Sequence, residues 1–289
     1  MDLSVHESGP ADAPTLLFVH GGGMSRWMWE PQLAQFSDYH CLVPDLPGHG
    51  ESAAIPFVSI ADCADRLVAL IRAKAHRKVA TVIGLSLGSQ ILLALMARYP
   101  GRVGRALLSG TLTQPVPGGA LLDVGMRAYG PLKNWPCLVR ANMRRLGIPD
   151  AYYPQWAADT RRTRTRTLAR VMAENLRFAP PERLDDVAVP SLLLTGETEN
   201  PLLQRAAEDL AGRLRNARSG VVQGVGHAWN LAAPELFSDS LRAWLTGSPL
   251  PDRITHLTAL KTLDVRIGPP ETAAVEEDDE DWWEDSQGG

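Results

Sequence analysis

The sequence predicts a domain of the α/β class, in which a mostly parallel sheet carries helices on both faces. Three observations lead to this prediction. Short apolar, β-branched segments alternate with longer segments of helical periodicity along most of the 289 residues. One strand-to-helix junction holds the pattern Gly84-Leu85-Ser86-Leu87-Gly88. The alternation stops between residues 113 and 186 and then resumes, which indicates an inserted helical unit.

The first half of the chain supplies four predicted strands and three predicted helices. Residues 59–75 carry the clearest helical pattern, because Ile60, Cys63, Leu67 and Ile71 recur at the spacing of one helix face. A further helix ends at Pro100-Gly101, where proline and glycine stop helical propagation. The predicted strands are 15–20, 39–44, 78–83 and 103–109, and the predicted helices are 27–36, 59–75 and 89–99.

The second half completes the sheet with strands at 191–195 and 218–223, the latter taken as the last strand, and helices at 201–214 and 234–245. We therefore expect a core made of residues 1–112 and 187–247, with a helical cap at 113–186. Residues 248–289 form a predicted extension with a disordered acidic tail. Ligands bind beyond the carboxyl ends of parallel strands, so a cap inserted there would cover Ser86.

The net charge of −4 hides an uneven distribution. Nine acidic residues lie between 271 and 285, so the other 24 face 29 basic residues and the body carries about +5. Much of this excess lies in the predicted cap, as Arg140, Arg144, Arg145, Arg161, Arg162, Arg164, Arg166 and Arg170. The arginine-rich segment 160–166 is interpreted as a solvated helix face, with attraction of an anionic substrate or carrier as the alternative, and the acidic tail could fold over this basic cap.

Several classes of protein are disfavoured by composition. Cys41, Cys63 and Cys137 are odd in number and widely spaced, which indicates free, mostly buried thiols in a reducing compartment. No spacing suits a structural zinc site. The start of the chain shows no secretory signal and no segment would span a bilayer, so we expect a cytoplasmic protein without membrane or nucleic-acid partners. A homodimer is compatible with the sequence.

Ser86 is the candidate nucleophile. A serine between two glycines, preceded by a strand and followed by a helix, is typical of a nucleophile elbow. The tight turn requires small residues two positions before and two after the serine. A glycine-rich turn that merely contains a serine is the alternative, and the flanking strand and helix favour the elbow.

His227 is the best candidate among seven histidines for the base that removes the serine proton. It follows the strand at 218–223, where a loop would bring it over the sheet edge. His20 and His49 adjoin glycines and are interpreted as structural. The acid that orients the base should follow the strand at 191–195, where Glu199 is preferred and Glu197 is the alternative. Both glutamates could instead cap the helix that begins at Pro201.

Acyl transfer also needs donors for the oxyanion. The elbow offers the backbone N–H of Leu87. The strand at 15–20 runs into Gly21-Gly22-Gly23, and Gly22 is the choice for the second donor, with Gly23 as the alternative. This glycine run lacks both a dinucleotide-binding pattern and a Lys-Ser/Thr ending, which argues against nucleotide binding.

Together these segments resemble the α/β-hydrolase superfamily, in its capped, serine-nucleophile branch. The resemblance spans residues 16–245 and includes His20-Gly21, the segment 45–52 (DLPGHGES), the elbow, the acid loop and Gly226-His227. It implies an α/β-hydrolase fold and a triad of Ser86, His227 and Glu199. The branch usually has aspartate at the position of Glu199, which places the acid's identity in question. Serine at the elbow argues against dehalogenase or epoxide hydrolase chemistry, which uses an aspartate nucleophile.

The sequence therefore predicts a serine hydrolase that cleaves carboxylic esters of small apolar substrates through an acyl-enzyme, without metal or organic cofactor. C–C bond, thioester or lactone hydrolysis, acyl transfer and perhydrolysis use the same residues and remain open. A non-catalytic ligand-binding receptor is the alternative from another class. The residues proposed for an apolar substrate pocket are Trp27, Met28, Trp135, Trp156 and Trp229, although most buried tryptophans belong to the core.

Overall fold

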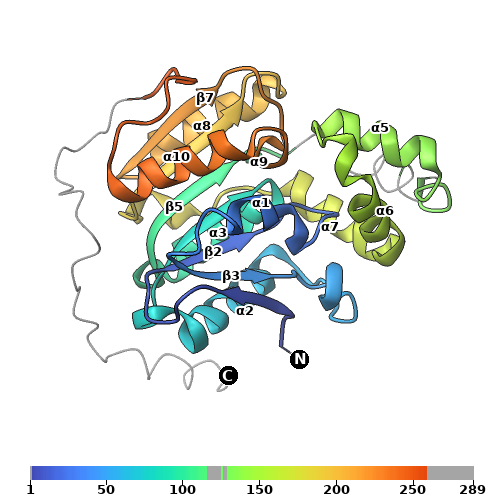
Figure 1. The fold of residues 1–289 in the computed structure, drawn as a ribbon, viewed down its shortest axis with the longest axis horizontal. Helices are drawn as coiled ribbons and strands as arrows, with labels where there is room; N and C mark the ends of the chain where they lie inside the picture. The colour runs from blue at the N-terminus through green and yellow to red at the C-terminus, as the bar shows by residue number, and fades with distance from the viewer. Residues whose placement is uncertain (1, 116–124, 126–128, 259–289) are drawn as a thin grey trace, which may run out of the picture.

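A computed structural model describes residues 2–115, 125 and 129–258 (Figure 1). Eight strands form one sheet in the order β1-β3-β2-β4-β5-β6-β7-β8. The six central strands pair in parallel, whereas β1 and β8 pair antiparallel at the two edges. The strands are β1 (Val5–Ser8), β2 (Thr15–Val19), β3 (His40–Pro44), β4 (Ala80–Leu85), β5 (Val103–Ser109), β6 (Ser191–Gly196), β7 (Ala217–Val222) and β8 (Ile254–Thr255).

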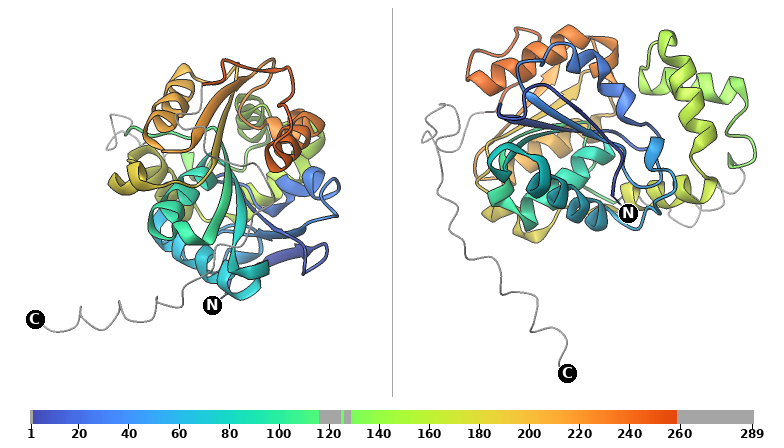
Figure 2. Two further views of the ribbon diagram at one scale, coloured as in Figure 1. Left: turned by 90° about the vertical axis from the view of Figure 1, so that its left-hand side faces the viewer. Right: turned by 60° about the horizontal axis from the view of Figure 1, so that its bottom comes forward.

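Helices cover both faces of the sheet, as expected (Figure 2). Side chains alternate along a strand, so Leu17 and Val19 of β2 pack on one face while Leu16 and Phe18 pack on the other. The first face carries α2 (Ile60–Lys74), α3 (Leu87–Arg98) and α8 (Pro201–Arg213), and the second carries α1 (Glu30–Leu33), α9 (Trp229–Ala232) and α10 (Pro234–Thr246). The mostly parallel α/β architecture is therefore confirmed.

The helix predicted at 59–75 is present as α2, and its own residues account for both its start and its buried face. Its start is fixed by Ser59, whose Oγ accepts a hydrogen bond from the Asp62 backbone N–H at 3.1 Å. The apolar stripe that predicted the helix, including Cys63 and Leu67, is fully buried against the sheet. The pattern needed to predict this helix therefore lies within the segment itself, as a cap residue followed by one apolar face.

Two features of the core differ from the prediction. The segment at 218–223 is not the last strand, because Ile254–Thr255 pairs with Val221 and Val222 and extends the core beyond residue 247. The predicted helix at 27–36 divides into a 3-10 turn, Arg26–Trp29, and the short helix α1. Pro31 lacks a backbone N–H, so a continuous helix through it would lose a hydrogen bond, whereas the first turn of α1 tolerates it.

The residues between β5 and β6 include three helices and, within their described part, no strand. We call the described residues 129–186 the cap segment, which contains α5 (Pro136–Leu146), α6 (Tyr153–Arg162) and α7 (Thr165–Arg177). Helices α5 and α6 project beyond the end of the sheet, and α7 leads back toward it (Figure 1). The predicted acidic tail and its contact with the cap fall on residues outside the described ranges.

Asp159 joins the cap segment to the core. Its carboxylate accepts hydrogen bonds from Ser25 Oγ at 3.0 Å and from Trp27 Nε1 at 2.6 Å. Burial raises the pKa of Asp159 to about 6, although both hydrogen bonds act in the opposite direction. Trp27, predicted as a pocket residue, is therefore engaged in holding α6 to the loop after β2. Of the three cysteines, Cys41 and Cys63 are buried and Cys137 is exposed, and all three are free.

Candidate active site

Ser86 lies at a strained turn between β4 and α3. Its backbone has φ 57° and ψ −118°, a conformation that non-glycine residues rarely adopt. Such a residue persists only when its surroundings hold it, at an energetic cost of about 1–3 kcal/mol. Part of that support is the hydrogen bond from the Ser86 N–H to the Ser109 carbonyl at 2.8 Å. The strand-turn-helix context predicted for the elbow is present.

The two glycines of the elbow are required by close backbone contacts. A Cβ atom at Gly88 would lie 2.2 Å from the carbonyl oxygen of Val19, where β2 ends. A Cβ atom at Gly84 would lie 2.8 Å from the backbone nitrogen of Ser89. Both distances are too short for any side chain, so the expectation of minimal residues two before and two after Ser86 is confirmed.

His227 and Glu199 meet over the carboxyl edge of the sheet. The Nδ1 atom of His227 lies 3.2 Å from Oε2 of Glu199, and Oε1 of that glutamate accepts the Gly196 N–H at 3.1 Å. The Glu199 side chain is 1% exposed and that of His227 is 15% exposed. A carboxylate shielded from water in this way fixes the imidazole with Nδ1–H toward the acid, which leaves Nε2 free to accept a proton.

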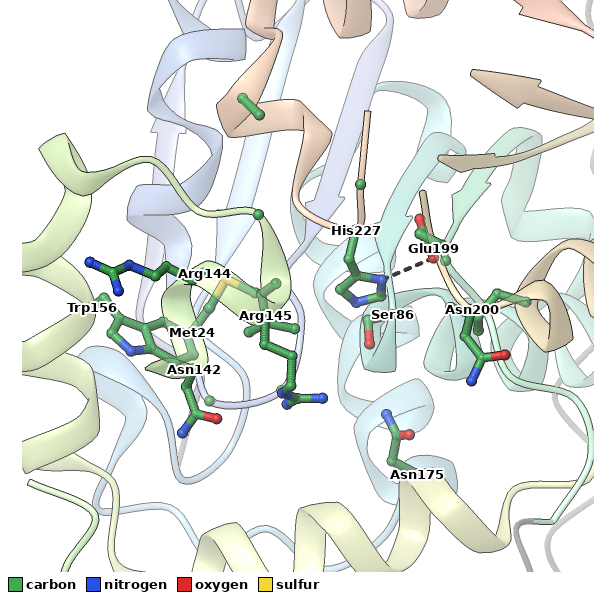
Figure 3. A pocket seen from close by; sticks show the side chains of 18 of the residues that line it. Met24, Ser86, Asn142, Arg144, Arg145, Trp156, Asn175, Glu199, Asn200 and His227 are labelled. Carbon is green, nitrogen blue, oxygen red and sulfur yellow. Dashed lines mark hydrogen bonds and ion pairs between the residues drawn. The ribbon is translucent and has the colours of Figure 1, made fainter. Parts of the chain in front are cut away.

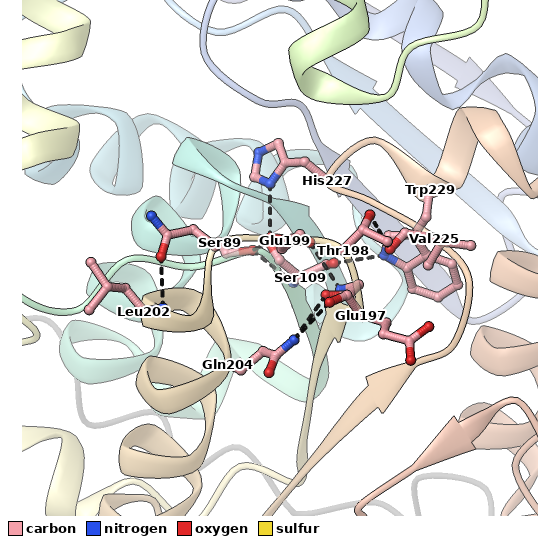
Figure 4. Close-up of polar contacts among 12 residues, drawn as sticks. Ser89, Ser109, Glu197, Thr198, Glu199, Leu202, Gln204, Val225, His227 and Trp229 are labelled. Carbon is pink, nitrogen blue, oxygen red and sulfur yellow. Dashed lines mark hydrogen bonds and ion pairs between the residues drawn. The ribbon is translucent and has the colours of Figure 1, made fainter.

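Glu197 has a different position. Its Oε2 accepts the backbone N–H of Gly224 at 2.8 Å. Its carbonyl oxygen accepts from Gln204 Nε2 at 3.2 Å (Figure 4). The first bond braces the loop after β6 against the loop after β7, and the second ties the same loop to α8. Only Glu199, of the two candidate acids, contacts His227. Capping of α8 falls instead to Asn200, whose Oδ1 accepts the Leu202 N–H at 3.0 Å.

Gly110 is a component of the site that the sequence analysis did not identify. It has φ +61°, and a Cβ atom there would lie 2.7 Å from Cε1 and 2.8 Å from Nδ1 of His227. The same atom would lie 3.4 Å from Oε2 of Glu199. The backbone of Gly110 therefore forms one wall against which the imidazole and the carboxylate pack. A glycine directly after a predicted strand was the available signal.

The two candidate oxyanion donors lie side by side. Leu87 is the first residue of α3, so its N–H belongs to the unpaired donors at a helix N-terminus. A Cβ atom at Gly22 would lie 3.6 Å from Cδ2 of Leu87, and both Gly22 and Ser86 line the same cavity. The neighbouring N–H of Gly23 is unsuited to this role, because it donates to His49 Nε2 at 3.1 Å.

His20 and His49 are structural, as interpreted from the sequence. His20 Nε2 accepts the Leu46 N–H at 2.9 Å and its Nδ1 pairs with the Gly21 carbonyl at 2.9 Å. His49 Nδ1 pairs with the carbonyl of Pro47 at 2.9 Å. Burial lowers the pKa of His20 to about 4 and that of His49 to about 3. Both rings therefore stay neutral and tie the glycine turn after β2 to the loop after β3.

A cavity of about 1000 Å³ opens above Ser86, between the sheet edge and the cap segment (Figure 3). Its wall includes Ser86, His227 and Glu199 from the core. The cap segment contributes polar residues from α5 and apolar residues from α7. The cavity is also lined by Gly22, Met24, Gly110, Tyr129, Asn142, Arg144, Arg145, Trp156, Leu168, Val171, Met172, Asn175, Leu176 and Arg253.

Four of the five side chains proposed for the substrate pocket lie elsewhere. Trp156 lines the cavity, whereas the other four are not among its lining residues. Met28 and Trp229 are fully buried in the core, and Trp229 Nε1 donates to Ser109 Oγ at 2.9 Å. Trp135 is 56% exposed on the surface of the cap segment. Hydrophobic character alone could not separate core tryptophans from pocket tryptophans, since both exclude water.

Comparison with known proteins agrees with this architecture. The Alpha/beta hydrolase family matches residues 16–240, so the chain belongs to that family. A protein of Gibberella zeae described as an AB hydrolase superfamily protein is 28% identical over 249 residues, which cover 82% of each chain. The (E)-2-((N-methylformamido)methylene)succinate hydrolase of Acinetobacter baylyi is 25% identical over 258 residues, covering 85% of this chain and 95% of that relative.

A solved structure shows the same fold. The enol-lactonase from Burkholderia xenovorans LB400 superposes with a TM-score of 0.73 at 21% identity, covering 84% of this chain and 96% of the other. Within the described ranges, no helix is long and apolar enough to cross a bilayer. The same ranges hold no group of three or more His, Cys, Asp or Glu side chains arranged to bind a metal ion.

Proposed function

We propose that this protein is a serine hydrolase of carboxylic esters, with Ser86 as nucleophile, His227 as general base and Glu199 as the orienting acid. The observation that carries the proposal is the convergence of a strained elbow serine and a His227–Glu199 pair with a buried carboxylate on one cavity. Serine needs a base to become nucleophilic, and the base needs a third group to fix its tautomer. The named hydrolase relative supports the reaction class.

In the proposed mechanism, His227 Nε2 removes the hydroxyl proton as Ser86 Oγ attacks the ester carbonyl carbon. The backbone N–H groups of Leu87 and Gly22 stabilise the oxyanion, and the N-terminal end of α3 adds its dipole. His227 then donates the proton to the departing alcohol, which leaves an acyl-enzyme. Water, activated by His227, attacks this ester and releases the acid, so that Ser86 regains its proton.

The cavity supports a substrate with an apolar portion. Met24, Leu168, Val171, Met172 and Leu176 form an apolar wall beside Ser86. Burial of an alkyl chain against such a wall contributes about 0.8 kcal/mol per methylene group. We therefore expect kcat/KM to rise with acyl length until the chain fills the space under α7.

The test is hydrolysis of p-nitrophenyl esters from acetate to decanoate by the wild type and by Ser86→Ala. The variant should fold with an unchanged thermal midpoint and lose turnover by at least about 10³-fold. A fluorophosphonate probe should label the wild type at Ser86 and leave the variant unlabelled. Equal turnover in both proteins would reject Ser86 as nucleophile, and a wild type that neither turns over esters nor labels would favour a non-catalytic receptor.

A further inference from the structure

The cavity wall formed by the cap segment carries a group of hydrogen-bond donors that the proposed triad does not use. We call Tyr129, Asn142 and Arg145 the cap subsite; all three line the cavity. Asn142 and Arg145 extend from the last turns of α5, and the Arg145 guanidinium points into the space that also holds Ser86 and Asn175 (Figure 3). Both side chains reach the cavity from the side opposite the acid loop.

The charges around the cavity are unbalanced. Three arginines line it, Arg144, Arg145 and Arg253, against one carboxylate, that of Glu199. That carboxylate is already bound to His227 and to the Gly196 N–H. Throughout the described part of the chain, neither Arg144 nor Arg145 has a carboxylate within ion-pair distance. All three arginines are solvent-exposed, so this excess of positive charge favours an anion in the cavity through an attraction that added salt weakens.

Tyr129 adds a neutral donor beside this charge. Its hydroxyl oxygen accepts a hydrogen bond from Asn142 Nδ2 at 2.7 Å, which leaves its own hydrogen available. Burial raises the pKa of Tyr129, while Asn142 and the charge of Arg145 oppose that shift. The phenol therefore stays protonated at neutral pH. A planar guanidinium next to a phenolic O–H offers several donors to one carboxylate group.

We propose that the cap subsite binds a carboxylate carried by the substrate, separated from the reacting ester by an apolar spacer. The proposal rests on the ester hydrolase function inferred above and names its substrate class. The spacer would lie along Leu168, Val171 and Met172 of α7, which line the same cavity. Such a substrate places its reacting carbonyl at Ser86 and its charge at Arg145. The apolar part and the charged part of the cavity then both have a function.

The test compares mono-p-nitrophenyl adipate and suberate with the corresponding methyl p-nitrophenyl diesters, in which an uncharged methyl ester replaces the remote carboxylate; turnover is followed by p-nitrophenol release, so that only cleavage of the p-nitrophenyl ester is counted. The wild type should show a higher kcat/KM for the acidic ester. In Arg145→Gln the ratio of acidic to neutral kcat/KM should fall at least tenfold, chiefly through KM, and Arg145→Lys should restore part of it. Arg166→Gln removes one cap charge from an exposed position outside the cavity lining and serves as the control.

A binding measurement separates this proposal from the proposed function. Calorimetry with adipate on Ser86→Ala reports the cap subsite without turnover, and the double variant carrying Arg145→Gln should lose at least tenfold in affinity. No ester turnover together with Arg145-dependent adipate binding would reject the hydrolase function and keep the subsite. Turnover dependent on Ser86, with an unchanged acidic-to-neutral ratio in Arg145→Gln or an equal loss in Arg166→Gln, would reject the subsite alone.

Discussion

Replacing Gly110 with alanine should damage the site although none of the three proposed catalytic residues is itself substituted. The new Cβ atom would lie 2.7 Å from His227 Cε1 and 2.8 Å from Nδ1, whereas ordinary contacts begin at about 3.4 Å. The imidazole must therefore move by roughly 0.7 Å. Misplacement of a catalytic group by about 1 Å can cost about 10²-fold in rate, so kcat/KM should fall by about tenfold to hundredfold.

The same substitution also gives a side chain to residue 110, whose backbone φ is +61°. A left-handed conformation costs a non-glycine residue about 1–2 kcal/mol, so the free energy of unfolding should fall by a similar amount. Gly247→Ala is the matched control, because Gly247 has φ 73° at the exposed end of α10 and is not among the residues lining the cavity. It should lose comparable stability and keep its activity.

The assay measures kcat/KM on the best p-nitrophenyl ester and unfolding in urea for both variants. If folded Gly110→Ala keeps kcat/KM within twofold of the wild type, the inferred contact with His227 does not position the ring. An equal loss of activity in Gly247→Ala would attribute the effect to backbone strain instead. Either result refutes the reasoning.

The remaining predictions concern the acid and the buried titratable groups. Glu199→Gln should lower kcat by about 10³–10⁴-fold through loss of the correct imidazole tautomer, whereas Glu197→Gln should change it only a few-fold. The raised pKa of Asp159, about 6, means that its contribution to stability is present below about pH 4 and lost as the pH rises through 6. Between pH 4 and 7 the free energy of unfolding of the wild type should therefore fall by up to about 3 kcal/mol relative to that of Asp159→Asn. The lowered pKa of His20, about 4, has the opposite sign, so stability present above pH 6.5 should be lost on acidification toward 4, and His20→Gln should weaken that loss.

Urea unfolding at several pH values measures the effects of Asp159 and His20 on stability. Each effect is taken as the difference between wild type and variant, because the two residues change stability with pH in opposite directions. A wild-type-to-Asp159→Asn difference that is flat from pH 4 to 7 would contradict the inferred burial of that carboxylate. Equal losses of kcat in Glu199→Gln and Glu197→Gln would show that support of the loop after β6, and not orientation of His227, determines activity.

The elements that the sequence predicted well are those whose pattern is complete within one segment. Helix α2 and strand β5 each carry their own apolar periodicity, so their bounds agree with the prediction within two residues. Strands β1 and β8 have four and two residues and no such pattern. They exist because β3 and β7 offer unpaired backbone groups at the sheet edges, which is information held in other parts of the chain.

The same distinction applies to the site. The spacing around Ser86 predicted the elbow because the steric requirement lies within five residues. The choice between Glu199 and Glu197 depended on which carboxylate faces His227, 28 residues further along the chain from Glu199. In the structure this is Glu199, whose other oxygen accepts the Gly196 N–H. Four of the five residues predicted for the pocket do not line the cavity, because burial in the core and exposure to a cavity give the same hydrophobic signal.

The sequence by itself determined the class of fold, the elbow and the order of the candidate catalytic residues, since these follow from local periodicity and local sterics. The tertiary structure alone decided which glutamate contacts His227, that Gly110 supports the imidazole, and that Arg145 faces the cavity of Ser86. These are contacts between segments that meet only after the sheet has formed. Their physical basis is close packing, which fixes atomic positions to within fractions of an ångström and cannot be inferred from one segment alone.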